Sequence, residues 1–141
     1  MHNEKDIYYN RIKKAFDKFY EINNLNDNHV IELCRELKID IAIDLMVHTG
    51  GTEYRPDIFV KKCAPIQINF LGYPGTSGSN HYDYIIADKT IIPEKHKKFY
   101  SEKVIYLPNS YQPSELNRPV SEDKNFSKKD FNLPEDKFIF C

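Results

Sequence analysis

The sequence predicts an α/β protein built on a Rossmann-like parallel sheet with helices on both faces. Short apolar segments at 39–47, 66–71, 84–87 and 104–107 have the length and pattern of strands. Segments with helical features stand between several of them. Strands that alternate with helices favour a parallel sheet covered on both faces.

The first half of the chain predicts a helix, a strand, a second helix and a second strand. Residues 8–15 have helical character, and residues 16–22 predict a short strand before an asparagine-rich turn. An amphipathic helix follows, with Asp27 or Asn28 as its N-cap and an apolar stripe at Val30, Leu33, Cys34 and Leu37. Apolar residues then alternate from Ile39 to Val47, as in a strand packed against a core.

In the second half of the chain, prolines indicate where a helix begins and where a linker lies. Pro56 opens a short helix that ends near Lys62, and residues 93–100 predict another. Three prolines between 108 and 119 indicate a linker. We therefore expect one lobe over 1–107, then over 108–141 a linker and the beginning of a second lobe. In that part, 127–131 predicts a helical turn, and 137–141 predicts a buried strand within which the sequence stops.

Composition limits the classes of function. The chain has 141 residues, enough for one ordinary domain. Leu, Ile, Val and Phe make up about 27% of them, which is enough for a hydrophobic core. Twenty Lys and Arg are scattered among 21 Asp and Glu, so nucleic acid is not expected as the main partner.

Cysteine usage and hydropathy exclude further classes. Cys34, Cys63 and Cys141 have neither an even count nor metal-type spacing, so no disulfide framework and no metal site is expected. The N-terminus is polar, and no apolar run approaches the roughly 18 residues of a membrane helix. No membrane association is expected, and the cytoplasm is the expected location.

The most informative segment is 64–78, where an apolar strand runs into a bend of glycines, proline and hydroxyls. Gly72 and Gly75 lack a Cβ, so the backbone there can adopt positive φ and come close to a bound molecule, while Pro74 stiffens the bend. The bend has neither the P-loop nor the dinucleotide-binding pattern. An ordinary turn is the competing interpretation. The candidate binding residues are Leu71, Gly72, Tyr73, Pro74, Gly75 and Thr76.

His48 and Thr49 form a second candidate, because they follow the preceding strand and share the same edge of the sheet. A histidine at this edge can contact a ligand or act as a base, although no partner is evident from the sequence. We expect Asp44, Asp83 and Asp88 to be structural, hydrogen-bonded carboxylates. No catalytic residue is assigned.

The motif series resembles the O-linked N-acetylglucosamine transferase family, in a bacterial-type or viral form. The resemblance rests on 64–78, on Asp83-Tyr84-Ile85-Ile86-Ala87-Asp88 and on Ser101-Glu102-Lys103 with Leu107-Pro108, and it extends over about 10–141. It implies an inverting, metal-independent GT-B glycosyltransferase that needs no cofactor. It also implies transfer of N-acetylglucosamine from UDP-GlcNAc to Ser or Thr of a protein or peptide acceptor, with Leu71-Gly72-Tyr73-Pro74 contacting the donor sugar.

The sequence departs from this family in several places. Val47 stands where the family often has glycine, residues 49–55 are about two residues longer than usual, and Lys61-Lys62-Cys63 replaces a common Arg-Pro. The family's earlier histidine segment, its diphosphate-binding lysine, its uridine pocket and its tetratricopeptide repeats have no counterpart. We therefore expect a fragment that forms part of the donor-sugar wall and is inactive alone.

Two alternatives stay open. The chain can be a standalone α/β binding module that kept the fold and lost the reaction. It can also belong to a related GT-B transferase that uses another sugar nucleotide, or an adhesin as acceptor.

Overall fold

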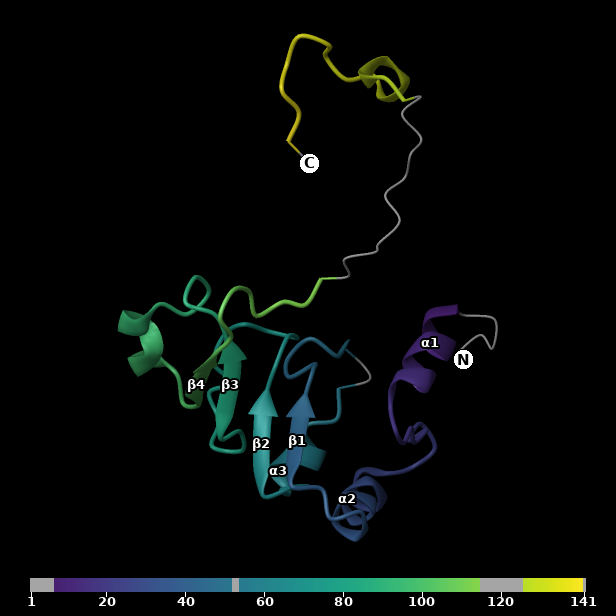
Figure 1. Ribbon diagram of the computed structural model, residues 1–141, viewed down its shortest axis with the longest axis vertical. Helices are drawn as coiled ribbons and strands as arrows, with labels where there is room; N and C mark the ends of the chain where they lie inside the picture. The colour runs from purple at the N-terminus through teal and green to yellow at the C-terminus, as the bar shows by residue number, and fades with distance from the viewer. Residues whose placement is uncertain (1–6, 52–53, 115–125, 141) are drawn as a thin grey trace.

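The computed structural model describes residues 7–51, 54–114 and 126–140, and a four-stranded sheet forms its centre (Figure 1). No helix in these residues has the length and apolar character needed to cross a bilayer. The elements are α1 (Ile7–Ala15), α2 (Asp27–Glu36), β1 (Ile41–Asp44), α3 (Asp57–Val60), β2 (Ile66–Asn69), β3 (Tyr84–Ala87), the 3-10 helix η2 (Glu94–Phe99), β4 (Lys103–Tyr106) and the 3-10 helix η3 (Lys128–Phe131).

The sheet is entirely parallel, and its strands lie side by side in chain order, β1-β2-β3-β4. The register pairs Asp44 with Asn69 and Asn69 with Ile85, so the carboxyl ends of the strands share one edge. The predicted parallel α/β fold is confirmed. The predicted strand at 84–87 matches β3, and the one at 104–107 is shifted by one residue from β4.

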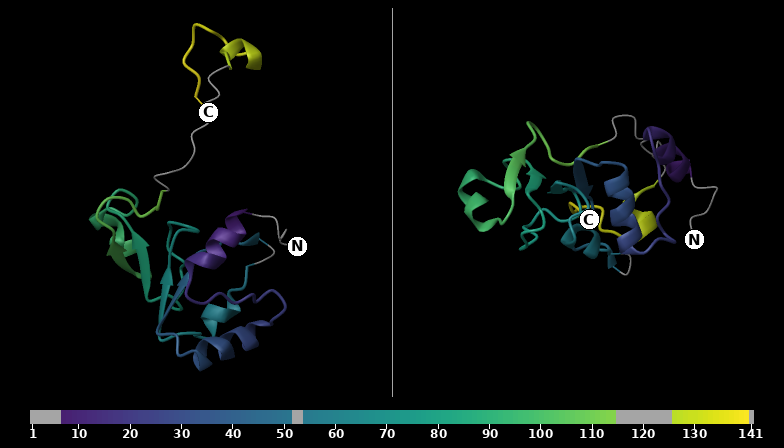
Figure 2. Two further views of the ribbon diagram at one scale, coloured as in Figure 1. Left: turned by 45° about the vertical axis from the view of Figure 1, so that its right-hand side comes forward. Right: turned by 90° about the horizontal axis from the view of Figure 1, so that it is seen from below.

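Both core clusters lie on one face of this sheet. The first packs α2 and α3 against Ala42 of β1. The second packs Ile92, from the connection between β3 and β4, against Ile85 and Ala87 of β3. The register places Ala42, Ile85 and Ala87 on the same face. In Figure 2, α2 and α3 lie together on one side of the strands.

The strand order explains this one-sided core. Crossovers between parallel strands are right-handed in nearly all proteins, and here each successive strand lies one step further in the same direction. Connections of one hand that step in one direction pass over the same face. The connections between these four strands therefore lie over one face, the face that carries both core clusters.

The opposite face carries exposed isoleucines. Ile41 and Ile43 of β1 expose 51% and 48% of their area, and Ile66 and Ile105 expose 37% and 38%. The alternation over 39–47 was expected to place this stripe against the core, and that prediction is wrong. Period two shows which residues share a face, but it does not show which face is covered.

The N-terminal segment confirms one predicted helix and corrects a predicted strand. Residues 8–15 lie in α1, but residues 16–22 form no strand. Instead, the ring of Phe19 packs edge-on against Tyr9 of α1, with 5.9 Å between the ring centroids. A strand needs a hydrogen-bonded neighbour, and this segment packs on a helix instead.

The N-cap of α2 also differs from the prediction. The side chain of Asn26, rather than Asp27 or Asn28, accepts the hydrogen bond from the His29 N–H, at 3.0 Å. Asp27 lies within the first turn and forms an ion pair with Arg55, with 2.6 Å between Oδ1 and Nε. A short-range pattern could not show this ion pair, because the two residues are 28 positions apart.

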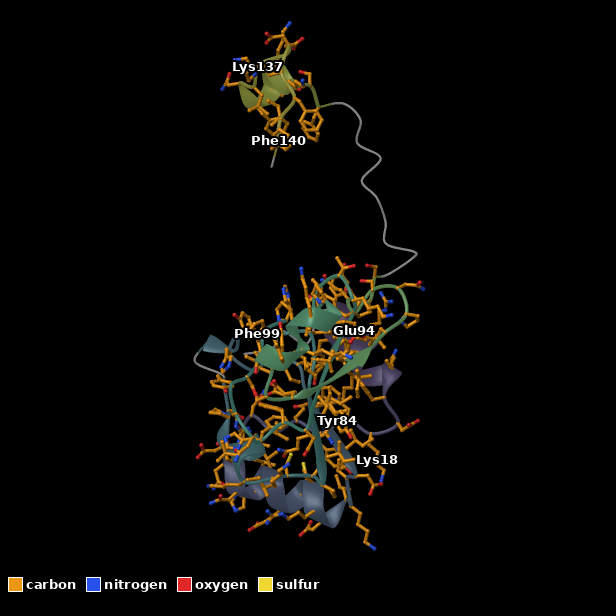
Figure 3. All side chains as sticks on the ribbon, turned by 90° about the vertical axis from the view of Figure 1, so that its left-hand side faces the viewer. Lys18, Tyr84, Glu94, Phe99, Lys137 and Phe140 are labelled. Carbon is orange, nitrogen blue, oxygen red and sulfur yellow. The ribbon has the colours of Figure 1, made fainter. Side chains whose placement is uncertain are left out.

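The C-terminal segment confirms the helical turn at 127–131, which forms η3 with a capping box between Ser127 and Asp130. The buried strand predicted over 137–141 is wrong for the described residues, since Phe138 and Phe140 are 81% and 89% exposed and 137–140 form no strand. Cys141 lies outside the described residues. Figure 3 labels Lys137 and Phe140 on this segment, and residues 137–140 pair with no strand of the described sheet.

The domain boundary near residue 107 stays a prediction. The Tyr111 N–H donates to the Asp88 carboxylate at 2.9 Å, so the first residues after β4 remain attached to the edge of the sheet. The last part of the predicted linker, residues 115–119, lies outside the described residues.

Arg55 provides the first testable prediction. Besides its ion pair with Asp27, its guanidinium donates to the carbonyls of Ile22 and Leu25, at 3.2 and 2.7 Å. Arg55→Met keeps much of the side-chain volume but leaves these partly buried acceptors unpaired. We expect the free energy of unfolding to fall by about 2 kcal/mol in urea denaturation. A loss equal to that of Lys61→Met, which removes an exposed amine from the end of α3, would contradict this role.

Candidate functional site

Two turns meet at the carboxyl edge of the sheet: residues 45–51 after β1, and the bend of residues 70–78 after β2. The Phe70 N–H donates to the carbonyl of Asp44 at 2.9 Å, which extends the strand pairing to the start of the bend. In open α/β sheets, ligands bind beyond this edge. The structure thus brings both sequence-predicted segments to one location.

Gly72 is required by close packing between these two turns. A Cβ on Gly72 would lie 2.6 Å from the carbonyl oxygens of Leu45 and Met46. Neither Gly72 nor Gly75 has a positive φ, which corrects the prediction from the sequence. The positive φ belongs to Leu71, and the backbone that approaches Gly72 is the protein's own.

The ring of Tyr73 covers Gly75, the second glycine of the predicted binding bend. A Cβ on Gly75 would lie 2.3 Å from the Tyr73 ring, so the ring rests directly on the backbone of the bend. The Tyr100 hydroxyl donates to the carbonyl of Pro74 at 3.2 Å. The aromatic ring of Tyr73, which is 47% exposed, is therefore presented to solvent on a fixed support.

Two residues with a side chain adopt positive φ in the turns that follow β1 and β2. Val47 has φ +44° and Leu71 has φ +68°, a region that residues with a Cβ avoid and that β-branched residues occupy only as outliers. Val47 is completely buried. Beneath the bend, the buried Asn69 Oδ1 has no hydrogen-bond partner in the described residues. Strain and an unpaired buried acceptor are features that functional sites retain at a cost in stability.

The Asp44 carboxylate holds the first turn. Its Oδ1 accepts from the N–H groups of Met46 and Val47 at 2.9 and 3.1 Å, and its Oδ2 accepts from the buried Tyr82 hydroxyl. Burial, followed by the hydrogen bond to Asp44, raises the pKa of Tyr82. Asp44 is 7% exposed and is satisfied by these donors, which confirms the structural role predicted for it.

Asp83 and Asp88 have the structural roles predicted for them as well. Asp83 accepts from the Gln67 N–H at 2.9 Å and forms an ion pair with Lys62. Asp88 accepts from three backbone N–H groups, those of Thr90, Ile91 and Tyr111.

Glu102 holds the second half of the bend, and sequence reasoning did not identify it as a site residue. Its Oε1 accepts from the Ser77 N–H and its Oε2 from the Thr76 hydroxyl, both at 2.7 Å. Its side chain is nearly fully buried at the start of β4. The only signal in the sequence was its presence in the family motif at 101–103, since these contacts span 25 to 26 residues.

His48 and Thr49 differ in what they contact. The Thr49 hydroxyl donates to the carbonyl of Met46 at 2.7 Å, so it closes its own turn. His48 is exposed, and its ring lies edge-on to Tyr73 at 6.0 Å between centroids. Its Nε2 is 3.3 Å from the carbonyl oxygen of Ser77. His48 therefore contacts the bend, whereas the side chain of Thr49 is hydrogen-bonded to the backbone of its own turn.

An open groove of about 390 Å³ lies beside the bend. Its lining combines three residues of the bend with aromatic residues of η2 and its C-cap: Tyr73, Gly75, Thr76, His96, Phe99 and Tyr100. Figure 3 labels Phe99 on this segment. A hollow of about 440 Å³ lies elsewhere, near Arg35, Lys38 and Pro65 at the amino ends of the strands, and does not involve the bend. The described residues contain no group of three His, Cys, Asp or Glu side chains arranged to hold a metal ion.

A protein-family model described as "Glycosyl transferase family 41" matches residues 2–118. The chain belongs to this family. An Arabidopsis thaliana member, "Probable UDP-N-acetylglucosamine--peptide N-acetylglucosaminyltransferase SEC", is 32% identical over 143 residues, covering 99% of this chain. A Caenorhabditis elegans member, named UDP-N-acetylglucosamine--peptide N-acetylglucosaminyltransferase, is 30% identical over 110 residues, covering 77% of this chain.

A solved structure supports the same family assignment. A mutant of Thermobaculum terrenum O-GlcNAc transferase matches 78% of this chain with a TM-score of 0.71 and 29% identity. The sheet therefore has the fold found in a GT-B member of family 41. The chain spans only 14% of the Arabidopsis relative, 9% of the Caenorhabditis relative and 21% of the Thermobaculum chain.

The Glu102 carboxylate of this family 41 chain gives a pH prediction. Burial raises its pKa, but hydrogen bonds from Ser77 and Thr76 outweigh burial and hold the pKa below its ordinary value. A carboxyl group with a lowered folded-state pKa stabilises the fold fully above its unfolded pKa, and this contribution is lost as the pH falls through the folded pKa. We expect Glu102→Gln to weaken the fall in unfolding free energy below about pH 4.3.

Urea denaturation followed by circular dichroism between about pH 6 and pH 3 measures this effect. The matched control is Glu94→Gln, which removes a carboxylate that is paired with Lys97 on the exposed η2 helix. Parallel pH curves for Glu102→Gln and the unmodified chain would show that Glu102 does not contribute.

Proposed function

We propose that this chain supplies part of the donor-sugar wall of a protein O-GlcNAc transferase. In this proposal, Leu71, Gly72, Tyr73, Pro74, Gly75 and Thr76, with His48 and Thr49 at the adjoining turn, form the surface that faces N-acetylglucosamine. The observation that carries the proposal is the bend itself: a fixed, strained turn at the carboxyl edge of the sheet, beside an open groove, in a family 41 chain.

The geometry supports a carbohydrate ligand. The exposed ring of Tyr73 offers an apolar face, and the bend offers backbone polar groups within the same few residues. Small-molecule sites combine apolar walls with a few fixed polar groups in this way. His48 adds an imidazole that contacts Tyr73 edge-on at the same edge of the sheet.

The reaction we propose for the complete transferase moves N-acetylglucosamine from UDP-GlcNAc to Ser or Thr of a protein or peptide acceptor, with inversion and without a metal or other cofactor. Glycosyl transfer leaves negative charge on the diphosphate, which must be met by cations or a helix N-terminus. We assign no such group and no catalytic residue to this chain. We therefore expect no sugar transfer by the 141-residue chain alone.

The proposal extends to the setting of the protein. We place it in the cytoplasm, with a sugar nucleotide and a polypeptide as its partners and with neither nucleic acid nor a membrane as a partner. Tetratricopeptide repeats are expected in the complete transferase.

A donor titration tests this function. The ¹⁵N-labelled chain is titrated with UDP-GlcNAc, UDP-glucose and N-acetylglucosamine, and amide shifts are followed by NMR. We expect shifts concentrated at residues 71–76, a stronger response to UDP-GlcNAc than to UDP-glucose, and loss of the response in Tyr73→Ala. Tyr20→Ala, which truncates an exposed tyrosine far from the bend in sequence, is the matched control.

Each other outcome has a defined meaning. A stronger response to UDP-glucose indicates a different donor and contradicts the proposed sugar. No response to any of the three compounds favours a non-catalytic module. Transfer of labelled N-acetylglucosamine to a peptide by the chain alone would contradict the expectation of an inactive fragment.

A further inference from the structure

The bend is held at two points by groups far from it in sequence. At its start, Gly72 packs against the carbonyls of Leu45 and Met46. At its end, Thr76 and Ser77 donate to the buried carboxylate of Glu102. Tyr73, Pro74 and Gly75 lie between these two points, and two of them, Tyr73 and Gly75, line the groove.

The second attachment depends on a group with two acceptor oxygens. Oε2 accepts from the hydroxyls of Thr76 and Ser101, at 2.7 and 3.1 Å, while Oε1 accepts from the Ser77 N–H. Thr76 Oγ1 in turn accepts from the N–H groups of Gly78 and Ser101, at 3.1 and 3.2 Å. With the contact of 2.9 Å between the Thr76 and Ser101 hydroxyls, six hydrogen bonds connect Glu102, Ser101 and residues 76–78 of the bend.

Burial makes this network unusual for a surface bend. Glu102 is 4% exposed, and a glutamate is almost never fully buried unless it is paired. No ion pair of Glu102 occurs in the described residues. Its charge is therefore stabilised by hydrogen-bond donors, which come from Thr76 and Ser77 of the bend, from the adjacent Ser101 and from its own backbone N–H. Removing the carboxylate leaves several of these donors without a partner.

We propose that Glu102 is the positioning residue of the bend: it fixes Thr76 and Ser77 so that Tyr73, Pro74 and Gly75 are held in the conformation that binds the sugar. This inference rests on the proposed function. Glu102 acts through Thr76 and Ser77 and does not itself contact the ligand, because its carboxylate is buried beneath the bend and fully engaged.

The test compares Glu102→Leu and Glu102→Gln with Thr76→Val. Leucine has a similar size but accepts no hydrogen bond, whereas glutamine still offers one acceptor oxygen and an N–H that the Thr76 hydroxyl can accept. Valine at position 76 keeps the shape of threonine without its hydroxyl. Glu94→Gln, on the exposed η2 helix, is the matched control.

Two properties are measured for each variant by NMR: amide hydrogen exchange at residues 75–78 relative to β2 and β3, and affinity for UDP-GlcNAc. We expect Glu102→Leu and Thr76→Val to speed exchange in the bend while the strands stay protected, and to weaken UDP-GlcNAc binding by about tenfold or more. Glu102→Gln should restore part of both properties. If Glu102 only stabilised the fold as a whole, Glu102→Leu would speed hydrogen exchange throughout the sheet. Glu102→Gln would then not restore slow exchange in the bend alone.

The results separate this inference from the proposed function. If the unmodified chain binds UDP-GlcNAc and Glu102→Leu binds it equally well, the positioning role is overturned and the proposed function stands. If the unmodified chain does not bind UDP-GlcNAc, the proposed function is overturned. The inference that Glu102 positions the bend for sugar binding is then overturned as well. If Glu102→Leu unfolds, Thr76→Val decides, because unchanged exchange and affinity in that variant also overturn the inference.

Discussion

Gly72→Ala is expected to destabilise the chain by about 3 kcal/mol or more. A Cβ at position 72 would lie 2.6 Å from two backbone carbonyl oxygens, those of Leu45 and Met46. Neither can move away as a flexible side chain would, so the turn after β1 and the bend must separate. Inserting a carbon into such a packed contact typically costs about 1–3 kcal/mol, and more where the backbone must shift. Urea denaturation measures the loss in the free energy of unfolding.

Gly78→Ala is the matched control for this substitution. Gly78 lies in the same bend with φ +68°, and a Cβ there meets nothing within 4 Å. Its alanine variant therefore carries only the cost of positive φ, about 1 kcal/mol. Equal losses for Gly72→Ala and Gly78→Ala would show that close packing is not what requires Gly72.

Asp44→Leu is expected to have a comparable or larger effect, a loss of about 3–5 kcal/mol. The substitution leaves the N–H groups of Met46 and Val47 and the buried Tyr82 hydroxyl without their acceptor. Each unsatisfied buried donor costs about 1–3 kcal/mol. Val47 is also held at φ +44°, and we expect this strained conformation to relax once its hydrogen bond is lost.

Thermal and urea denaturation measure the effect, with Asp57→Leu as the control. Asp57 is an exposed aspartate in the first turn of α3, 4.0 Å from Lys61, so its removal should cost less than about 1 kcal/mol. A loss for Asp44→Leu as small as that of Asp57→Leu would contradict the role of Asp44. Asp44→Asn retains one acceptor oxygen and is expected to fall between the two.

The parallel sheet could be predicted because its signals are local. Apolar runs such as 84–87 identify a strand within a few residues, and the turns that follow β1 and β2 necessarily meet at one edge of a parallel sheet. The positions of His48 and of the bend at residue 72 follow from this geometry. The alternation over 39–47, by contrast, left open which face of β1 is covered.

The covered face depends on the direction in which the chain crosses the sheet. That direction is a property of the whole strand order, and no segment of the sequence carries it. The roles of the glycines escaped prediction for a related reason. Gly72 is needed because of carbonyls 26 to 27 positions away, and its neighbour Leu71 takes the positive φ.

Glu102 shows the same limit within the candidate site. Its neighbours Ser101 and Lys103 give no indication of its burial, and its partners Thr76 and Ser77 come from another loop. Buried carboxylates are recognised by the donors around them, and those donors are brought together only by the fold. Sequence reasoning could therefore locate the bend but not the residue that holds it.

The central claim is that residues 71–76 of the bend contact the sugar of the donor. Saturation-transfer difference NMR of UDP-GlcNAc with the unmodified chain tests this claim most directly. The claim predicts stronger saturation of the N-acetyl methyl and pyranose protons than of the uridine protons, with the sugar signals lost in Tyr73→Ala. Saturation confined to the uridine, or sugar signals that persist unchanged in Tyr73→Ala, would contradict it.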